Sequence, residues 1–74
     1  MLNDKNILEY AIKGVDAEIA EIEKSISKGK KIIKEDESKL YDVQPIINLK
    51  KAEIEKLVKF KDDLKWQLAE IEDK

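Results

Sequence analysis

The side chains in this 74-residue chain that could do chemistry are carboxylates, lysines and a few serines. The chain has no histidine, cysteine, arginine or threonine, and its serines are Ser25, Ser27 and Ser38. The usual nucleophile and base pairs of hydrolases therefore cannot be assembled from one chain. The carboxylates also lack the Glu-x-x-His spacing of helical di-metal sites. We expect a protein that is not an enzyme and that needs no metal or other cofactor.

The lysines are concentrated in the middle of the chain. Residues 24–34 contain five lysines and no acidic residue, and residues 56–66 contain four more. Such a central lysine belt could attract RNA, a nucleotide or another polyanion, although the absence of arginine removes bidentate contacts to phosphate. The candidate anion-binding residues are Lys28, Lys30, Lys31, Lys34, Lys59 and Lys61.

These charged residues must be positioned by helices, because a hydrophobic seam with a period of seven runs from Leu8 to Ile71. Its first series is Ile12, Ile19, Ile26, Ile33, Leu40, Ile47, Ile54, Lys61 and Leu68. Its second series is Leu8, Val15, Ile22, Gly29, Asp36, Val43, Lys50, Leu57, Leu64 and Ile71. With 43% charged residues, two glycines and one proline, the chain is predicted to be one all-α domain spanning residues 1–74.

Two arrangements fit this seam: one long helix that pairs in parallel with a copy, or an antiparallel hairpin that turns at residues 42–45. Proline in mid-helix costs about 3 kcal/mol, whereas Pro45 is well suited to the first turn of a new helix. The sequence therefore favours an antiparallel coiled-coil helical hairpin with helices at about 4–43 and 46–73. Facing residue numbers then add to about 90, and Glu23 faces Lys65 at the edge of the seam. The parallel alternative gives no edge ion pair.

Four residues interrupt the seam: Gly29, Asp36, Lys50 and Lys61. Asp36 and Lys50 are predicted to form an ion pair across the helices. Lys61, opposite Gly29 in this register, either extends its stem to water or binds an anion. Gly29 either ends a helix or is tolerated inside one.

Residues 1–15 have no intrachain partner in this register. We expect them to form an apolar overhang, or a segment that folds back at a hinge at Gly14. The overhang and the outer side of the second helix supply the candidate protein interface, which consists of Leu2, Ile7, Leu8, Tyr10, Ile12, Val15, Phe60 and Trp66.

Self-association is expected because a chain this short buries little surface and has no disulfides. The apolar stripe is wider than the seam, which is typical of hairpins that pair into a four-helix bundle. We predict a homodimer that also binds a protein partner, as an adaptor or inhibitor of the kind encoded by accessory or phage genes. The alternative is a polyanion-binding regulator. The N-terminal residues lack a signal-peptide pattern and no stretch suits a bilayer, so we expect a cytoplasmic protein without membrane contact.

Overall fold

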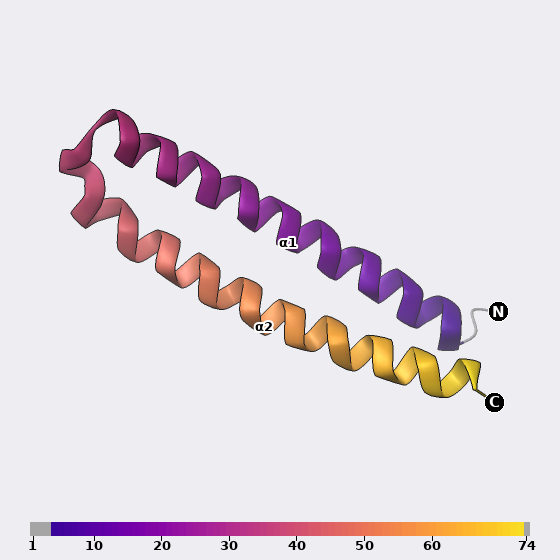
Figure 1. Ribbon diagram of the computed structural model, residues 1–74. Coiled ribbons are helices and arrows are strands. Elements are labelled where there is room, and N and C mark those ends of the chain that lie inside the picture. Colours follow the sequence, from indigo (N-terminus) through magenta and orange to yellow (C-terminus); the bar gives the residue numbers. More distant parts are fainter. Residues whose placement is uncertain (1–3, 74) are drawn as a thin grey trace.

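Two long helices form the molecule, and the computed structural model describes residues 4–73. Helix α1 spans Asp4–Glu35, the short 3-10 helix η1 spans Glu37–Lys39, and α2 spans Leu40–Glu72. α1 and α2 lie side by side in opposite directions, with the connection at one end and the start of α1 and the end of α2 at the other (Figure 1). The predicted all-α fold and the helical hairpin are therefore confirmed. The predicted outer helix boundaries, at about residues 4 and 73, agree with the structure, whereas the inner boundaries, at residues 43 and 46, are wrong.

Helix α1 is continuous through both glycines of the chain. A single glycine costs a helix about 1 kcal/mol, which is less than the packing of seam residues on either side provides. Gly14 is consequently not a hinge, and Gly29 does not end the helix. The segment before Gly14 continues α1 and does not fold back as a separate helix.

The turn lies at Asp36, in the extended conformation that ends α1 (φ −146°, ψ 96°). The Asp36 carboxylate accepts hydrogen bonds from the backbone N–H of Ser38 at 3.1 Å and from its hydroxyl at 2.6 Å. The Asp36 N–H donates to the carbonyl of Ile32 at 2.9 Å, and its carbonyl accepts from the N–H of Lys39 at 3.0 Å. Asp36 is thus the N-cap of η1, and it is not paired with Lys50 as predicted. The ion pairs found within residues 4–73 involve neither side chain.

Pro45 lies inside α2, as its sixth residue. Proline removes the hydrogen bond to the carbonyl of Tyr41 and crowds that carbonyl. Because Tyr41 lies in the first turn of α2, the distortion is confined to the start of the helix. Tyr41 is 86% exposed, so water can reach this part of the helix. The prediction that the chain turns at residues 42–45 is therefore wrong.

The register of the two helices is shifted from the predicted one by two heptads. Three contacts define it: Lys61 Nζ with Asp16 Oδ1, Lys5 Nζ with Glu72 Oε1 at 3.5 Å, and Gly29 against Ile47. The residue numbers in these pairs add to 76 or 77, whereas the expected value was about 90. A shift of two heptads keeps both seam series facing the partner helix, which explains why the predicted helical phase holds although the turn does not.

In the observed register, α2 also covers the segment of α1 that was predicted to overhang. Val15 is 7% exposed and Leu64 is equally buried, while Leu8 and Ile12 are half-buried. Burying one Val, Leu or Ile side chain contributes roughly 1.5–3 kcal/mol, so covering several of them outweighs the cost of a helical proline, which is about 3 kcal/mol. Residues 4–15 therefore belong to the hairpin core and do not form an overhang, and residues 1–3 lie outside the described part.

The most buried side chain is Ile47, which is 2% exposed and packs against Ile22 and Ile26. Gly29 lies directly beneath it. A Cβ atom at Gly29 would lie 3.0 Å from Ile47 Cγ1 and 3.2 Å from Val43 Cγ1. The missing side chain at this seam position therefore lets the two helices approach closely near the turn.

The hairpin is long and thin, with extents of 56 × 18 × 14 Å. Its solvent-accessible surface is 6105 Å², whereas a compact monomer of 8.6 kDa would have about 4,700 Å². None of the helices in residues 4–73 combines the length and apolarity needed to cross a bilayer. The cytoplasmic location expected from the sequence stays a prediction.

Candidate interaction surface

Most of the large apolar side chains outside the seam remain exposed. Buried hydrophobic residues are few in the described chain: Val15, Ile22, Ile26, Ile47 and Leu64. The large hydrophobic residues that are at least 40% exposed are Ile7, Tyr10, Ile32, Leu40, Tyr41, Ile46, Leu49, Val58, Phe60 and Trp66. The hairpin thus presents more large apolar side chains to solvent than it buries, which is typical of proteins with an interaction surface.

Four of these residues share one side of the hairpin, and we call them the apolar edge: Ile32, Ile46, Leu49 and Phe60. Ile32, Ile46 and Phe60 each directly precede a residue of the first seam series. In an antiparallel helix pair, positions of this kind on both helices lie on the same side. The observed register places Ile32 of α1 across from Ile46 of α2, and Leu49 follows Ile46 by one helical turn. Their exposed fractions range from 46% for Ile32 to 72% for Leu49.

The predicted N-terminal interface residues separate into two groups. Val15 is buried, and Leu8 and Ile12 are half-buried, in the packing against α2. Ile7 and Tyr10 remain exposed, at 50% and 82%. The predicted interface residue Leu2 lies outside the described residues. The structure therefore removes the three seam residues from the candidate interface.

The two exposed aromatic residues Tyr10 and Trp66 lie at the same level of the hairpin but on different sides. Both occupy the helix positions farthest from the seam, on α1 and α2 respectively, so their side chains point away from the partner helix. Trp66 is 72% exposed and borders a shallow surface hollow with Asp62, Lys65 and Ala69. The structure does not bring Tyr10, Trp66 and Phe60 together into one patch.

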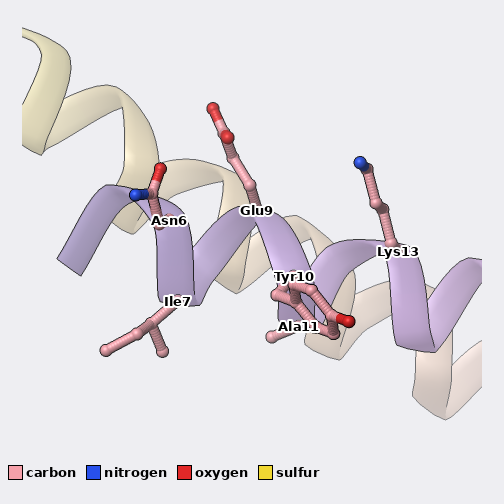
Figure 2. Close-up of a pocket in the computed structure, with 6 residues that line it drawn as sticks. All are labelled: Asn6, Ile7, Glu9, Tyr10, Ala11 and Lys13. Carbon is pink, nitrogen blue, oxygen red and sulfur yellow. The ribbon is translucent and has the colours of Figure 1, made fainter. Parts of the chain in front are cut away.

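A second hollow lies along the first turns of α1. Its lining residues are Asn6, Ile7, Glu9, Tyr10, Ala11 and Lys13. Figure 2 shows that all of them come from α1, and that Asn6, Glu9 and Lys13 point to the side of the helix opposite Ile7. Because one helix supplies all of its lining residues, this hollow is open to solvent and provides no enclosed, convergent set of polar groups of the kind that small-molecule sites contain.

The observed register divides the lysine residues predicted to form one belt. Residues 24–34 face residues 42–52, so Lys28, Lys30, Lys31 and Lys34 lie near the turn, whereas Lys59 and Lys61 lie toward the chain ends. The Lys61 ammonium pairs with the Asp16 carboxylate, and the Lys61 side chain is 22% exposed. An anion at Lys61 would therefore have to displace Asp16. The continuous belt predicted from the sequence is not formed.

Ile32, Ile46 and Leu49 were not among the residues predicted for the interface. The available signal was their position directly beside the seam, since apolar residues there widen the stripe of a helix beyond what one partner helix covers. In the predicted register Ile32 faced Phe60, so the neighbourhood of Ile32 and Ile46 did not arise.

Within residues 4–73 no group of three or more acidic, histidine or cysteine side chains is placed to hold a metal ion. Comparison of the chain with protein-family models, with curated proteins and with solved structures gave no match. The surface itself is therefore the basis for a functional proposal.

Proposed function

We propose that this protein is a small, non-enzymatic protein–protein interaction module that self-associates and presents an apolar helical surface. The observation that carries the proposal is the excess of exposed apolar side chains over buried ones. A hairpin with an accessible surface of 6105 Å², where roughly 4,700 Å² is usual for its mass, gains stability by covering part of that area.

The proposed assembly is a dimer in which two hairpins pair into a four-helix bundle. Each hairpin would contribute its apolar edge, while the two seam series pack in the manner of an antiparallel coiled coil within each chain. The elongated shape supports this assembly, because helices of 32 and 33 residues can pair along their whole length. Tyr10 and Trp66 would remain at the surface, where an adaptor or inhibitor could bind a second protein through them.

Light scattering and thermal unfolding test the self-association. At micromolar concentration we expect a mass of about twice 8.6 kDa and a Tm that rises with protein concentration, because association stabilises the folded state by mass action. A monomeric mass with a Tm that is independent of concentration would contradict the proposal.

Polyanion binding is the second candidate function, and the exposed lysines of residues 24–34 are the observation that favours it. Binding to a short RNA should then weaken steeply with salt, with a slope set by the number of phosphates contacted. A double Lys30→Gln, Lys31→Gln variant should reduce that slope, and Lys59→Gln, which lies farther from the turn at the level of residues 17–18, is the control. Absence of binding at low salt would exclude this function for RNA.

A further inference from the structure

The apolar edge consists of two parts that repeat along α2. Ile46, together with Leu49 and Ile32, forms the part near the turn, and Phe60 forms the part toward the chain ends. Ile46 and Phe60 are 14 residues apart, which is about 21 Å along a helix. Because two heptads separate them, both residues lie on the same side of the hairpin.

Charge is distributed unevenly along the same axis. The half near the turn, residues 24–52, contains eight lysines and four acidic residues, a net charge of +4. The half near the chain ends, residues 4–23 and 53–73, contains six lysines and 13 acidic residues, a net charge of −7. A molecule charged in this way attracts a copy of itself only when the two point in opposite directions.

We propose that the partner on the apolar edge is a second copy of this chain, packed with its turn next to the first copy's chain ends. This inference rests on the proposed function and adds the face, the orientation and the alignment of the dimer. Interfaces of this kind are two-fold symmetric, so each contact occurs twice.

The alignment follows from the two parts of the apolar edge. With the two-fold axis level with Glu53, Ile46 of each copy lies against the partner's Phe60. On α1, the same axis is level with residues 23–24, and it brings Lys28 to within about one helical turn of the partner's Glu21 along the axis. Both residues are exposed, and this alignment gives each dimer two ion pairs between copies.

The parallel dimer is disfavoured because it places halves of like net charge at the same level. The two halves near the turn, each with a net charge of +4, would lie side by side, and so would the two halves near the chain ends, each with a net charge of −7. Like charges at an interface lower affinity and are a common means of excluding a wrong orientation.

The orientation can be measured directly, because the chain has no cysteine and accepts a single spin label. Glu37 is exposed and lies at the turn, so Glu37→Cys places one label at that end of each copy. In the proposed dimer the two labels lie about 40 Å apart, from the rise of 1.5 Å per helical residue. A parallel dimer would place them within about 25 Å, given helices packed 8–10 Å apart.

Each outcome has a separate meaning. A long distance supports the proposed orientation, and a short distance in a stable dimer overturns it while leaving self-association intact. A monomer, shown by light scattering on the unlabelled chain, refutes the proposed function as well.

The face is tested by two glutamate substitutions at exposed positions of α2. Leu49 and Tyr41 are 72% and 86% exposed, so neither substitution affects the hairpin core. They are eight residues apart, which places them about 80° apart around α2, and Tyr41 lies outside the apolar edge. Leu49→Glu should raise the dimer Kd about tenfold or more, since it places an unpaired charge in an apolar contact. Tyr41→Glu should leave the Kd unchanged. Equal effects of the two variants would overturn the assignment of the face.

A charge exchange tests the alignment. Lys28→Glu and Glu21→Lys should each raise the Kd several-fold, and the chain carrying both substitutions should recover most of the affinity. Residues 21 and 28 are seven positions apart on α1, too far for a direct pair within one chain. Failure of the double variant to recover, in a dimer that Leu49→Glu does disrupt, would overturn the alignment.

Discussion

Gly29 contributes no side chain to the seam, and Ile47 occupies the space that a side chain would need. Ile47 is 2% exposed, so the surrounding core gives it little freedom to move. Gly14 occupies the same helix, but nothing lies within 4 Å of a Cβ atom placed there. The two glycines therefore differ in packing while sharing the same backbone conformation.

Alanine at each glycine should have opposite effects on stability. Gly14→Ala should raise the free energy of unfolding by about 0.5–1 kcal/mol, because alanine favours the helix. Gly29→Ala gains the same helix preference but forces its methyl group against Ile47, and overpacking of a core costs about 1–3 kcal/mol. We expect net destabilisation, measured by urea unfolding. Stabilisation by both substitutions would show that α1 and α2 are not in close contact at Gly29.

At the scale of elements, the connection between α1 and α2 depends on one side chain more than on proline. The Asp36 carboxylate accepts two hydrogen bonds from Ser38, and it ends one helix while starting the next. Pro45, which is inside α2, restricts the backbone but lacks the N–H that a helix uses. The turn and the proline are therefore separate features of this chain.

Removing the cap should weaken the turn. Asp36→Ala should lower the free energy of unfolding by about 1 kcal/mol, within the range measured for N-cap residues. Glu37→Ala removes a neighbouring carboxylate for which the structure shows no hydrogen bond, and it should have a much smaller effect. If both variants lose the same stability in urea unfolding, the effect is one of net charge and not of capping.

Replacing the proline should stabilise the protein. Pro45→Ala restores a helical hydrogen bond to the carbonyl of Tyr41, and the gain should exceed the 0.4–1 kcal/mol that proline contributes by restricting the unfolded chain. We expect a higher Tm in calorimetry. A lower Tm would mean that the second helix begins at Pro45.

The sequence was sufficient to predict two antiparallel helices and the seam residues that pack between them, because the seam series have one phase along the chain. It was not sufficient to place the turn. A shift of two heptads leaves every seam residue in the interface, and the position opposite Glu23 at the edge of the seam is a lysine in either register, Lys65 in one and Lys51 in the other. Asp36 was the informative residue: an acidic side chain at a seam position is unfavourable there and favourable as a cap. The apolar edge could not be found before the register was known.

At the scale of the whole molecule, the seam is paired along its full length, from Lys5 and Glu72 at the open end to the turn. The predicted overhang would have left the first turns of α1 without a role in stability. In the structure these turns cover the last turns of α2.

A charged substitution at Val15 distinguishes a start of α1 that is packed against α2 from an overhang. Val15→Asp places a carboxylate at a site that is 7% exposed, and it should lower the free energy of unfolding by several kcal/mol or abolish folding. Ala17→Asp, at an exposed site two residues later, should cost under about 1 kcal/mol, the range of helix propensities. Circular dichroism during urea unfolding provides the measurement. Equal stabilities of the two variants would contradict the packing of Val15 against α2 and would support the predicted overhang.

The two-heptad repeat has a consequence for how the chain folds. A hairpin that turns at Pro45 keeps five wholly apolar layers, as many as the observed one: Ile33–Val43, Ile22–Ile54, Ile19–Leu57, Ile12–Leu64 and Leu8–Leu68 in the native register. Such a slipped hairpin reaches the native register by separating its helices, since sliding would pass through registers in which the seam side chains no longer fit between those of the partner helix. Refolding should therefore show a slow phase from slipped molecules in addition to the fast closure expected of a local helical hairpin. Pro45→Ala should reduce its amplitude by removing the residue that favours the wrong turn.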